Sequence, residues 1–107
     1  MIRVELLHNE GCHVWKDTRE LLKSILVERN VEYKLRERLI RTQEEAREHK
    51  FLGSPQVKIN GRDIDPEAAK IQTYNPNGCR IYLYKDDVYE YPPRELILEA
   101  LDRLRVG

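Results

Sequence analysis

The chain has 107 residues, enough for one domain built on a single hydrophobic core. Nineteen basic residues balance nineteen acidic ones, so no overall charge favours nucleic acid or an anionic membrane as a partner. No apolar run is long enough to span a bilayer, and no secretory leader precedes the first predicted strand. We therefore expect a cytoplasmic protein without membrane or nucleic-acid partners.

The two cysteines, Cys12 and Cys79, lie far apart in the sequence, and neither belongs to a Cys-x-x-Cys pair. Because only three histidines accompany them, a structural zinc site with four ligands is not expected. In a reducing cytosol two such cysteines are more often free, catalytic or redox-sensing than joined in a permanent disulfide. The cysteine count leaves these three roles open.

The first half of the chain predicts the order strand, helix, strand, helix. Residues 2–7 are rich in apolar side chains, as in a central strand buried on both faces, and apolar positions three and four apart predict a helix over about residues 13–28. Alternation predicts a second strand within residues 31–40. A capping box at Thr42 opens a short helix that ends near residue 50. Two parallel strands joined by a right-handed crossover follow from this order.

The second half predicts two hairpins and a last helix. Val57 and Ile59 mark a third strand, and Asn60-Gly61 is the strongest short hairpin signal that a sequence carries. Beyond it, two tyrosine-rich runs predict a second hairpin, and Pro93 opens an amphipathic helix. The partner strand of the first hairpin and the two tyrosine-rich runs are expected at residues 62–65, 79–84 and 88–91.

Cys12 lies where the first strand turns into the first helix, within the polar stretch from His8 to Trp15. Unpaired main-chain N–H groups and the positive end of the helix dipole favour a thiolate at such a place. His13 and His8 are candidates for additional positive charge. The alternative is that Cys12 is a small buried hydrophobic residue. Its polar flanks favour the reactive thiol.

This order of elements, with a cysteine after the first strand and a proline before the third, resembles the thioredoxin superfamily, nearest its small glutaredoxin-like members. The resemblance covers about residues 1–66 and 93–107. It places Cys12 on the family's nucleophilic cysteine, Pro55 on its cis-proline, and Ser54 on the residue whose backbone pairs with a bound thiol substrate. The chain is also similar to short uncharacterised thioredoxin-like proteins, sometimes found beside mercury-resistance enzymes, that share a Gly-Cys-x-x-Trp start and a later Cys-Arg-x-Tyr.

The resemblance implies an α/β fold, a thioredoxin-like βαβαββα sandwich in one domain over residues 1–107. Residues 67–92, with the tyrosine-rich hairpin, form an insertion before the last helix. Trp15 stands where dithiol members carry a second cysteine, so no disulfide forms within the motif, and we expect Trp15 to pack against the core or to shield Cys12. Asp65-Pro66 replaces the glycine pair that helps glutaredoxins to hold glutathione, so neither glutathione nor another cofactor is expected.

The activity implied is that of a thiol–disulfide oxidoreductase or redox switch, with protein or small-molecule thiols and disulfides as partners. Cys12 attacks as a thiolate, and Cys79 on the insertion is the candidate resolving thiol. The residues assigned to the site are Cys12, Cys79 and His13 for catalysis, and Ser54, Pro55 and Trp15 for substrate binding.

Three alternatives stay open. In the first, Cys79 is a strand cysteine that is buried beneath the tyrosines. In the second, the chain is a non-catalytic thioredoxin-fold module that binds a protein through the Ser54–Pro55 edge or the tyrosine hairpin. In the third, Cys12 and Cys79 together bind a soft metal ion such as mercury or copper.

Overall fold

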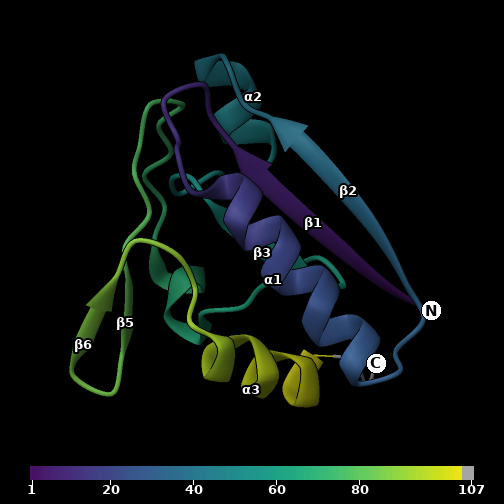
Figure 1. Cartoon of the computed structure of the whole chain (residues 1–107). Coiled ribbons are helices and arrows are strands. Elements are labelled where there is room, and N and C mark those ends of the chain that lie inside the picture. Colours follow the sequence, from purple (N-terminus) through teal and green to yellow (C-terminus); the bar gives the residue numbers. More distant parts are fainter. Residues whose placement is uncertain (105–107) are drawn as a thin grey trace.

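The computed structural model describes residues 1–104, and within them it shows three α-helices, a four-stranded sheet, a short 3-10 helix and a separate two-stranded hairpin (Figure 1). The elements, in chain order, are β1 (Ile2–His8), α1 (Trp15–Glu28), β2 (Tyr33–Leu39), α2 (Gln43–Glu48), β3 (Gln56–Ile59), β4 (Arg62–Asp63), the 3-10 helix η1 (Pro66–Lys70), β5 (Tyr82–Tyr84), β6 (Asp87–Tyr89) and α3 (Arg94–Leu104). The protein therefore has the α/β architecture that the sequence predicts.

The main sheet is mixed, with the strand order β2-β1-β3-β4. β1 and β2 are parallel, which the crossover through α1 requires, whereas β1–β3 and β3–β4 are antiparallel. Both parallel strands end on the same side, where α2 and the loop between β1 and α1 lie (Figure 1). This end of the sheet contains Cys12.

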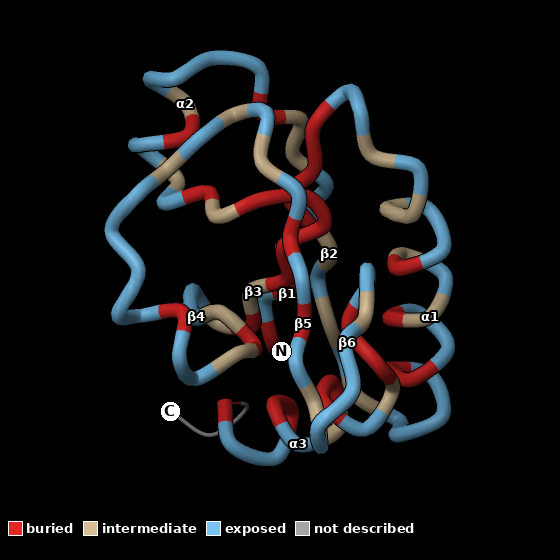
Figure 2. Tube along the Cα trace, turned by 90° about the vertical axis from the view of Figure 1, so that its left-hand side faces the viewer, coloured by how far each residue is buried: buried red, intermediate tan, exposed pale blue. Residues whose placement is uncertain are grey.

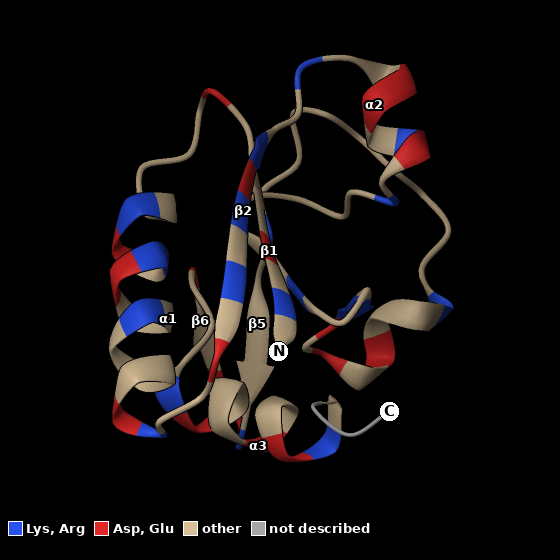
Figure 3. Ribbon diagram, turned by 90° about the vertical axis from the view of Figure 1, so that its right-hand side faces the viewer, with Lys and Arg blue, Asp and Glu red and all other residues tan. Residues whose placement is uncertain are grey.

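The sheet has one apolar and one charged face. The apolar face packs against α1 and α3, and the buried positions follow the inner sides of these elements (Figure 2). α2 and η1 lie on the opposite side of the sheet from α1 (Figure 3). There a smaller core forms from Leu7, Ile40, Ala46 and Phe51. Leu7 breaks the alternation of β1 because it belongs to this second core.

The charged face is formed by residues that are neighbours across the strands. Arg3 lies beside Lys34, while Glu5 lies between Arg36 of β2 and Lys58 of β3. Only the last part of β1 is buried on both faces, since Arg3 is exposed and Glu5 is half-buried. The expectation of a strand buried throughout is corrected accordingly.

Most predicted turns and caps are present. Thr42 and Glu45 form the complete capping box, and Asn60 and Gly61 have φ angles of 52° and 83°, as a tight hairpin turn requires. In the second hairpin the turn falls on Lys85 and Asp86, with φ angles of 50° and 71°. The hairpin exists as predicted, but its strands are shorter than the two tyrosine-rich runs.

The first helix begins later than predicted. It starts at Trp15 instead of about His13, because the Cys12 N–H donates to the Asn9 carbonyl, 3.3 Å away, in a turn ahead of the helix. β4 also ends early, at Asp63, whose carboxylate accepts from the Asp65 N–H at 2.8 Å and turns the chain into η1. No helix within residues 1–104 is long and apolar enough to cross a membrane.

Candidate functional site

Cys12 lies in the loop of residues 9–14, between β1 and α1, with a half-buried side chain and a free thiol. It precedes the N-cap residue Val14 by two positions, so it lies further from the helix than the predicted start at about His13 implied. No side chain within residues 1–104 caps this end of α1. The N–H groups of the first turn therefore have no side-chain acceptor beside the loop of Cys12.

His8 and Trp15 close this loop by stacking on each other. Their ring centroids lie 3.8 Å apart, and the rings are within 5° of parallel. Trp15 also packs against the main core, as predicted. Burial lowers the pKa of His8, an effect that the Glu37 carboxylate only partly opposes. His8 is therefore a poor source of the positive charge expected of it, whereas His13 is exposed beside Cys12.

The peptide bond between Ser54 and Pro55 is cis, as predicted. Ser54 is buried, and both of its main-chain groups are already paired. Its N–H donates to the Gly78 carbonyl, and its carbonyl accepts from the Arg80 N–H, both at 3.0 Å. These two bonds form a parallel β-bridge between Ser54 and Cys79. The edge that we expected to receive an external peptide is thus filled by the chain itself.

We call residues 75–81, which run across this edge, the strap. The loop of Cys12 holds the strap through Asn9, whose Nδ2 donates to the carbonyls of Pro76 and Gly78 at 3.1 and 2.9 Å. The same Asn9 accepts from the Cys12 N–H through its own carbonyl. Asn9 therefore links the loop that carries Cys12 to the residue directly before Cys79.

Close backbone packing also fixes the strap. Gly53 has a φ of 133°, and a Cβ added there would lie 2.8 Å from the Arg80 nitrogen and from the Cys79 carbonyl carbon. Only glycine adopts this conformation without strain and allows so close an approach. The Gly53 Cα would in turn lie 3.4 Å from a Cβ added to Gly78.

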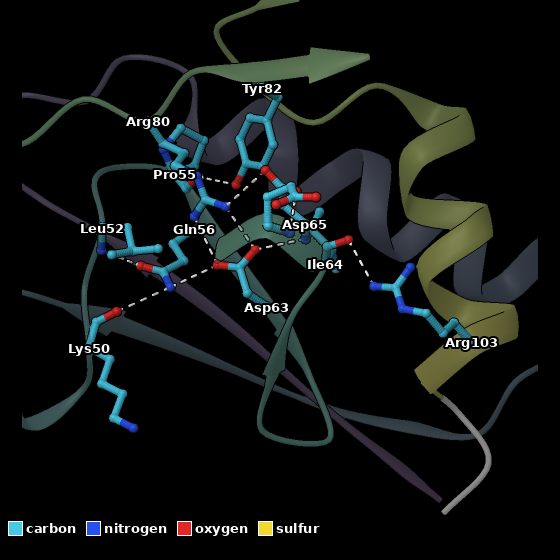
Figure 4. A network of polar contacts seen from close by, with 11 residues as sticks. Lys50, Leu52, Pro55, Gln56, Asp63, Ile64, Asp65, Arg80, Tyr82 and Arg103 are labelled. Atoms are coloured by element: carbon cyan, nitrogen blue, oxygen red, sulfur yellow. Dashed lines mark hydrogen bonds and ion pairs between the residues drawn. The ribbon is translucent and has the colours of Figure 1, made fainter. Parts of the chain in front are cut away.

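Arg80 anchors the strap in a buried polar network (Figure 4). Its guanidinium donates to both carboxylate oxygens of Asp63, at 2.9 and 2.8 Å, and lies 3.9 Å from Asp65. Gln56 donates to Asp63 at 2.9 Å, and the Tyr82 hydroxyl donates to the Pro55 carbonyl at 2.6 Å. The strap is therefore fastened on both sides of Cys79.

The structure brings Ser54, Pro55 and Cys79 together and connects them to the loop of Cys12, Trp15 and the exposed His13. Cys79 is exposed and free, so it is not the cysteine buried beneath the tyrosines of the first alternative. Sequence reasoning missed Asn9 and the anchor that Arg80 makes with Asp63. The Cys-Arg-x-Tyr sequence pointed to Arg80, but nothing in the sequence pairs it with an aspartate seventeen residues away.

Within residues 1–104, no group of three or more His, Cys, Asp or Glu side chains could hold a metal ion. The fold and the site thus define a mixed α/β protein. Its exposed Cys79 lies opposite Ser54, the residue before the cis-proline, because the residues on either side of Cys79 bond to the Ser54 backbone. Residues 2–101 match the family model described as Domain of unknown function (DUF2703), and the chain belongs to that family. No curated protein and no solved structure matches it.

Proposed function

We propose that the protein is a thiol–disulfide redox protein on a glutaredoxin-like variant of the thioredoxin fold, with Cys12 as the nucleophile and Cys79 as the resolving thiol. The β-bridge between Ser54 and Cys79 carries the proposal. In the superfamily that the chain resembles, the residue before the cis-proline pairs with the substrate that presents its thiol. Here the strap makes that pairing, so Cys79 occupies the place of a substrate thiol.

The arrangement of the elements supports the fold assignment. The order β1-α1-β2-α2-β3-β4-α3, with the η1 and β5–β6 segment before the last helix, is the order implied by the resemblance. So is a mixed sheet in which β1 is flanked by parallel β2 and antiparallel β3. The insertion, residues 67–92, then supplies the second cysteine that the Trp15 position lacks.

The chemistry is a two-step exchange in which the substrate disulfide is the oxidant. The Cys12 thiolate attacks one sulfur of the substrate, forming a mixed disulfide and releasing the other sulfur as a thiolate. The Cys79 thiolate then attacks Cys12 Sγ, which expels the second substrate thiolate and leaves a Cys12–Cys79 disulfide. Two electrons pass from the protein to the substrate, and the two protons lost by the cysteines go to the two released thiols.

Local charge supports Cys12 as the attacking sulfur. The N-terminus of α1, a helix of 14 residues, lies beside its loop and has no side-chain cap among residues 1–104. Exposed His13, the next residue in the sequence, is a candidate for additional positive charge beside Cys12. Cys79, exposed on the strap, is accessible to attack the mixed disulfide.

This arrangement counts against the module that binds a peptide through the Ser54–Pro55 edge. Both main-chain groups of Ser54 are used by the strap, so an extended peptide pairs there only after Gly78 and Arg80 have been displaced. The cost includes two main-chain hydrogen bonds, each contributing about 0.5–1.5 kcal/mol. The anchor at Asp63 adds to this cost.

The test is stoichiometric reaction with an aromatic disulfide such as Ellman's reagent, followed by mass spectrometry and non-reducing peptide mapping. We expect wild type to release both halves of the reagent and to end with an intramolecular Cys12–Cys79 bridge. Cys79→Ser should stop at a stable Cys12 adduct, and Cys12→Ser should react more slowly. The bridge would close a long loop and raise the free energy of unfolding by on the order of 4 kcal/mol.

Persistent adducts on wild-type Cys12, or dimers joined through Cys12, would show that Cys79 does not resolve the mixed disulfide. Equal reaction rates for Cys12→Ser and Cys79→Ser would show that Cys12 is not the preferred nucleophile. Either result refutes the proposed two-cysteine mechanism.

A further inference from the structure

A cavity of about 600 Å³ lies on the charged face of the sheet, the face to which Lys58 belongs. Its walls come from β3, β4 and η1, from the chain around Leu52, from Ile71 to Tyr74, and from Arg103 of α3. This volume is within the range of small-molecule sites in proteins. Cys12, Ser54, Pro55 and Cys79 are not among its lining residues, so the cavity is separate from the cysteine site.

Four cations line the cavity, namely Lys50, Lys58, Arg62 and Arg103. The two carboxylates in its wall, Asp63 and Asp65, face the guanidinium of Arg80 at 2.8 and 3.9 Å. Arg80 therefore offsets one of these two negative charges from inside the protein. The lining carries a surplus of positive charge that an anion would neutralise.

Lys58 is the most informative of these cations. It is half-buried, and burial lowers the pKa of its ammonium despite the nearby carboxylates of Glu5 and Asp63. Within residues 1–104 its Nζ donates to one acceptor, the His49 carbonyl. Since a lysine ammonium has three N–H donors, two remain for another acceptor. An anion in the cavity would satisfy them.

The rest of the lining suits an apolar group. Gln56 is buried at the wall of the cavity. Its side-chain oxygen accepts from the Leu52 N–H, and its side-chain nitrogen donates to Asp63 (Figure 4). Around this polar floor the cavity is lined by the apolar side chains of Leu52, Pro66, Ala68, Ala69 and Ile71. Ile71 is 47% exposed, a large apolar side chain left partly open at the rim.

We propose that this cavity is a binding site for a small organic anion, with a phosphate or carboxylate head group on Lys58 and its neighbouring cations and an apolar body against the alanine and isoleucine wall. The head group accepts from the remaining Lys58 donors and neutralises the surplus positive charge of the lining. The apolar body covers surface that water now contacts, which favours binding in proportion to the area buried. The site does not depend on the chemistry of Cys12 and Cys79.

The probes are phenyl phosphate and benzoate, which carry the two head groups on the same ring, and benzylamine as a cation of matched size. Amide chemical shifts of the ¹⁵N-labelled protein are followed during titration. We expect at least one anion to saturate, with the largest shifts at Lys50, Leu52, Ala68 and Ala69. The anion that binds more tightly shows whether the site prefers a phosphate or a carboxylate head group.

Variants assign the charge that holds the anion. Lys58→Met should weaken binding about tenfold, the effect of losing one charged hydrogen bond. Arg62→Gln, an exposed substitution in the same lining, should weaken anion binding several-fold. It tests the site even if Lys58→Met has a folding defect. Lys34→Met, on the same sheet face but outside the cavity, should leave affinity unchanged within twofold.

Three outcomes would overturn the site. The first is that neither anion saturates below about 10 mM, because such an affinity is too weak for a built site. The second is that benzylamine binds equally well. The third is that affinity is unchanged in both Lys58→Met and Arg62→Gln. Cys12→Ser and Cys79→Ser are expected to bind the anion like wild type, so failure of the redox proposal leaves this result interpretable.

Discussion

Replacing Arg80 by methionine tests whether a buried ion pair holds the strap in place. Arg80 is 6% exposed, and its partner Asp63 has a side chain that is 10% exposed. The variant keeps a long unbranched side chain but leaves the carboxylate buried without its cation. Breaking a buried pair by removing one partner typically costs about 3–5 kcal/mol.

The contacts that Asp63 retains place the estimate at the lower end of that range. Gln56 and the Asp65 N–H still donate to the carboxylate, at 2.9 and 2.8 Å. We therefore expect Arg80→Met to lower the free energy of unfolding by about 3 kcal/mol. In a domain of this size, that loss lowers Tm by roughly 10–15 °C.

Urea denaturation followed by circular dichroism measures the effect, and a double-mutant cycle separates the pair from the individual side chains. Adding Asp63→Asn to Arg80→Met removes the stranded charge and should recover about 1 kcal/mol or more. Arg36→Met, an exposed substitution on β2, should stay within about 0.5 kcal/mol of wild type. A loss below about 1 kcal/mol for Arg80→Met, or no recovery in the double variant, would refute the role given to the pair.

Three further substitutions test other contacts. Gly53→Ala places a Cβ 2.8 Å from the strap backbone at a φ of 133° and should lower the free energy of unfolding by more than about 2 kcal/mol. The control, Gly61→Ala, has no atom within 4 Å of the added Cβ and should lose only the conformational penalty of about 1 kcal/mol. Urea denaturation of both variants measures the difference. Tyr82→Phe removes a buried hydrogen bond and should lower the free energy of unfolding by about 1–2 kcal/mol. The control is Tyr84→Phe, because the Tyr84 hydroxyl donates to an exposed carboxylate. Equal losses in the two variants would contradict the assignment. Since burial lowers the pKa of His8, protonation favours the unfolded chain, and wild-type stability should fall as pH drops below about 6.5. His8→Phe, which keeps the stack, should flatten that part of the pH profile.

Features that depend on neighbours in the sequence were predictable. The Thr42 capping box, the Asn60-Gly61 turn and the apolar face of the last helix all follow from residues within a few positions of one another. The exact start of α1 was not, because a turn closed by the bond from the Cys12 N–H to the Asn9 carbonyl lies ahead of the helix.

The strap could not be predicted, because its contacts join distant parts of the chain. Asn9 bonds to Gly78 across 69 positions, and Gly53 is pressed against the backbone of Cys79 and Arg80. Composition and periodicity describe how a segment folds on itself but contain no information about which residue it meets elsewhere. The resemblance predicts that residues 67–92 form an insertion, whereas the pairing of Gly78 and Arg80 with Ser54 is known only from the structure.

The position of β2 has a consequence for association between copies of the chain. β2 forms one edge of the four-stranded sheet, and an edge strand offers unpaired main-chain groups to any second strand. Lys34 and Arg36 are exposed at alternate positions along it, and Figure 3 shows basic residues along β2. If two copies met edge to edge, these cations would stand opposite their own counterparts, an arrangement that destabilises strand pairing. The same charges that mark one face of the sheet thus protect its open edge from aggregation.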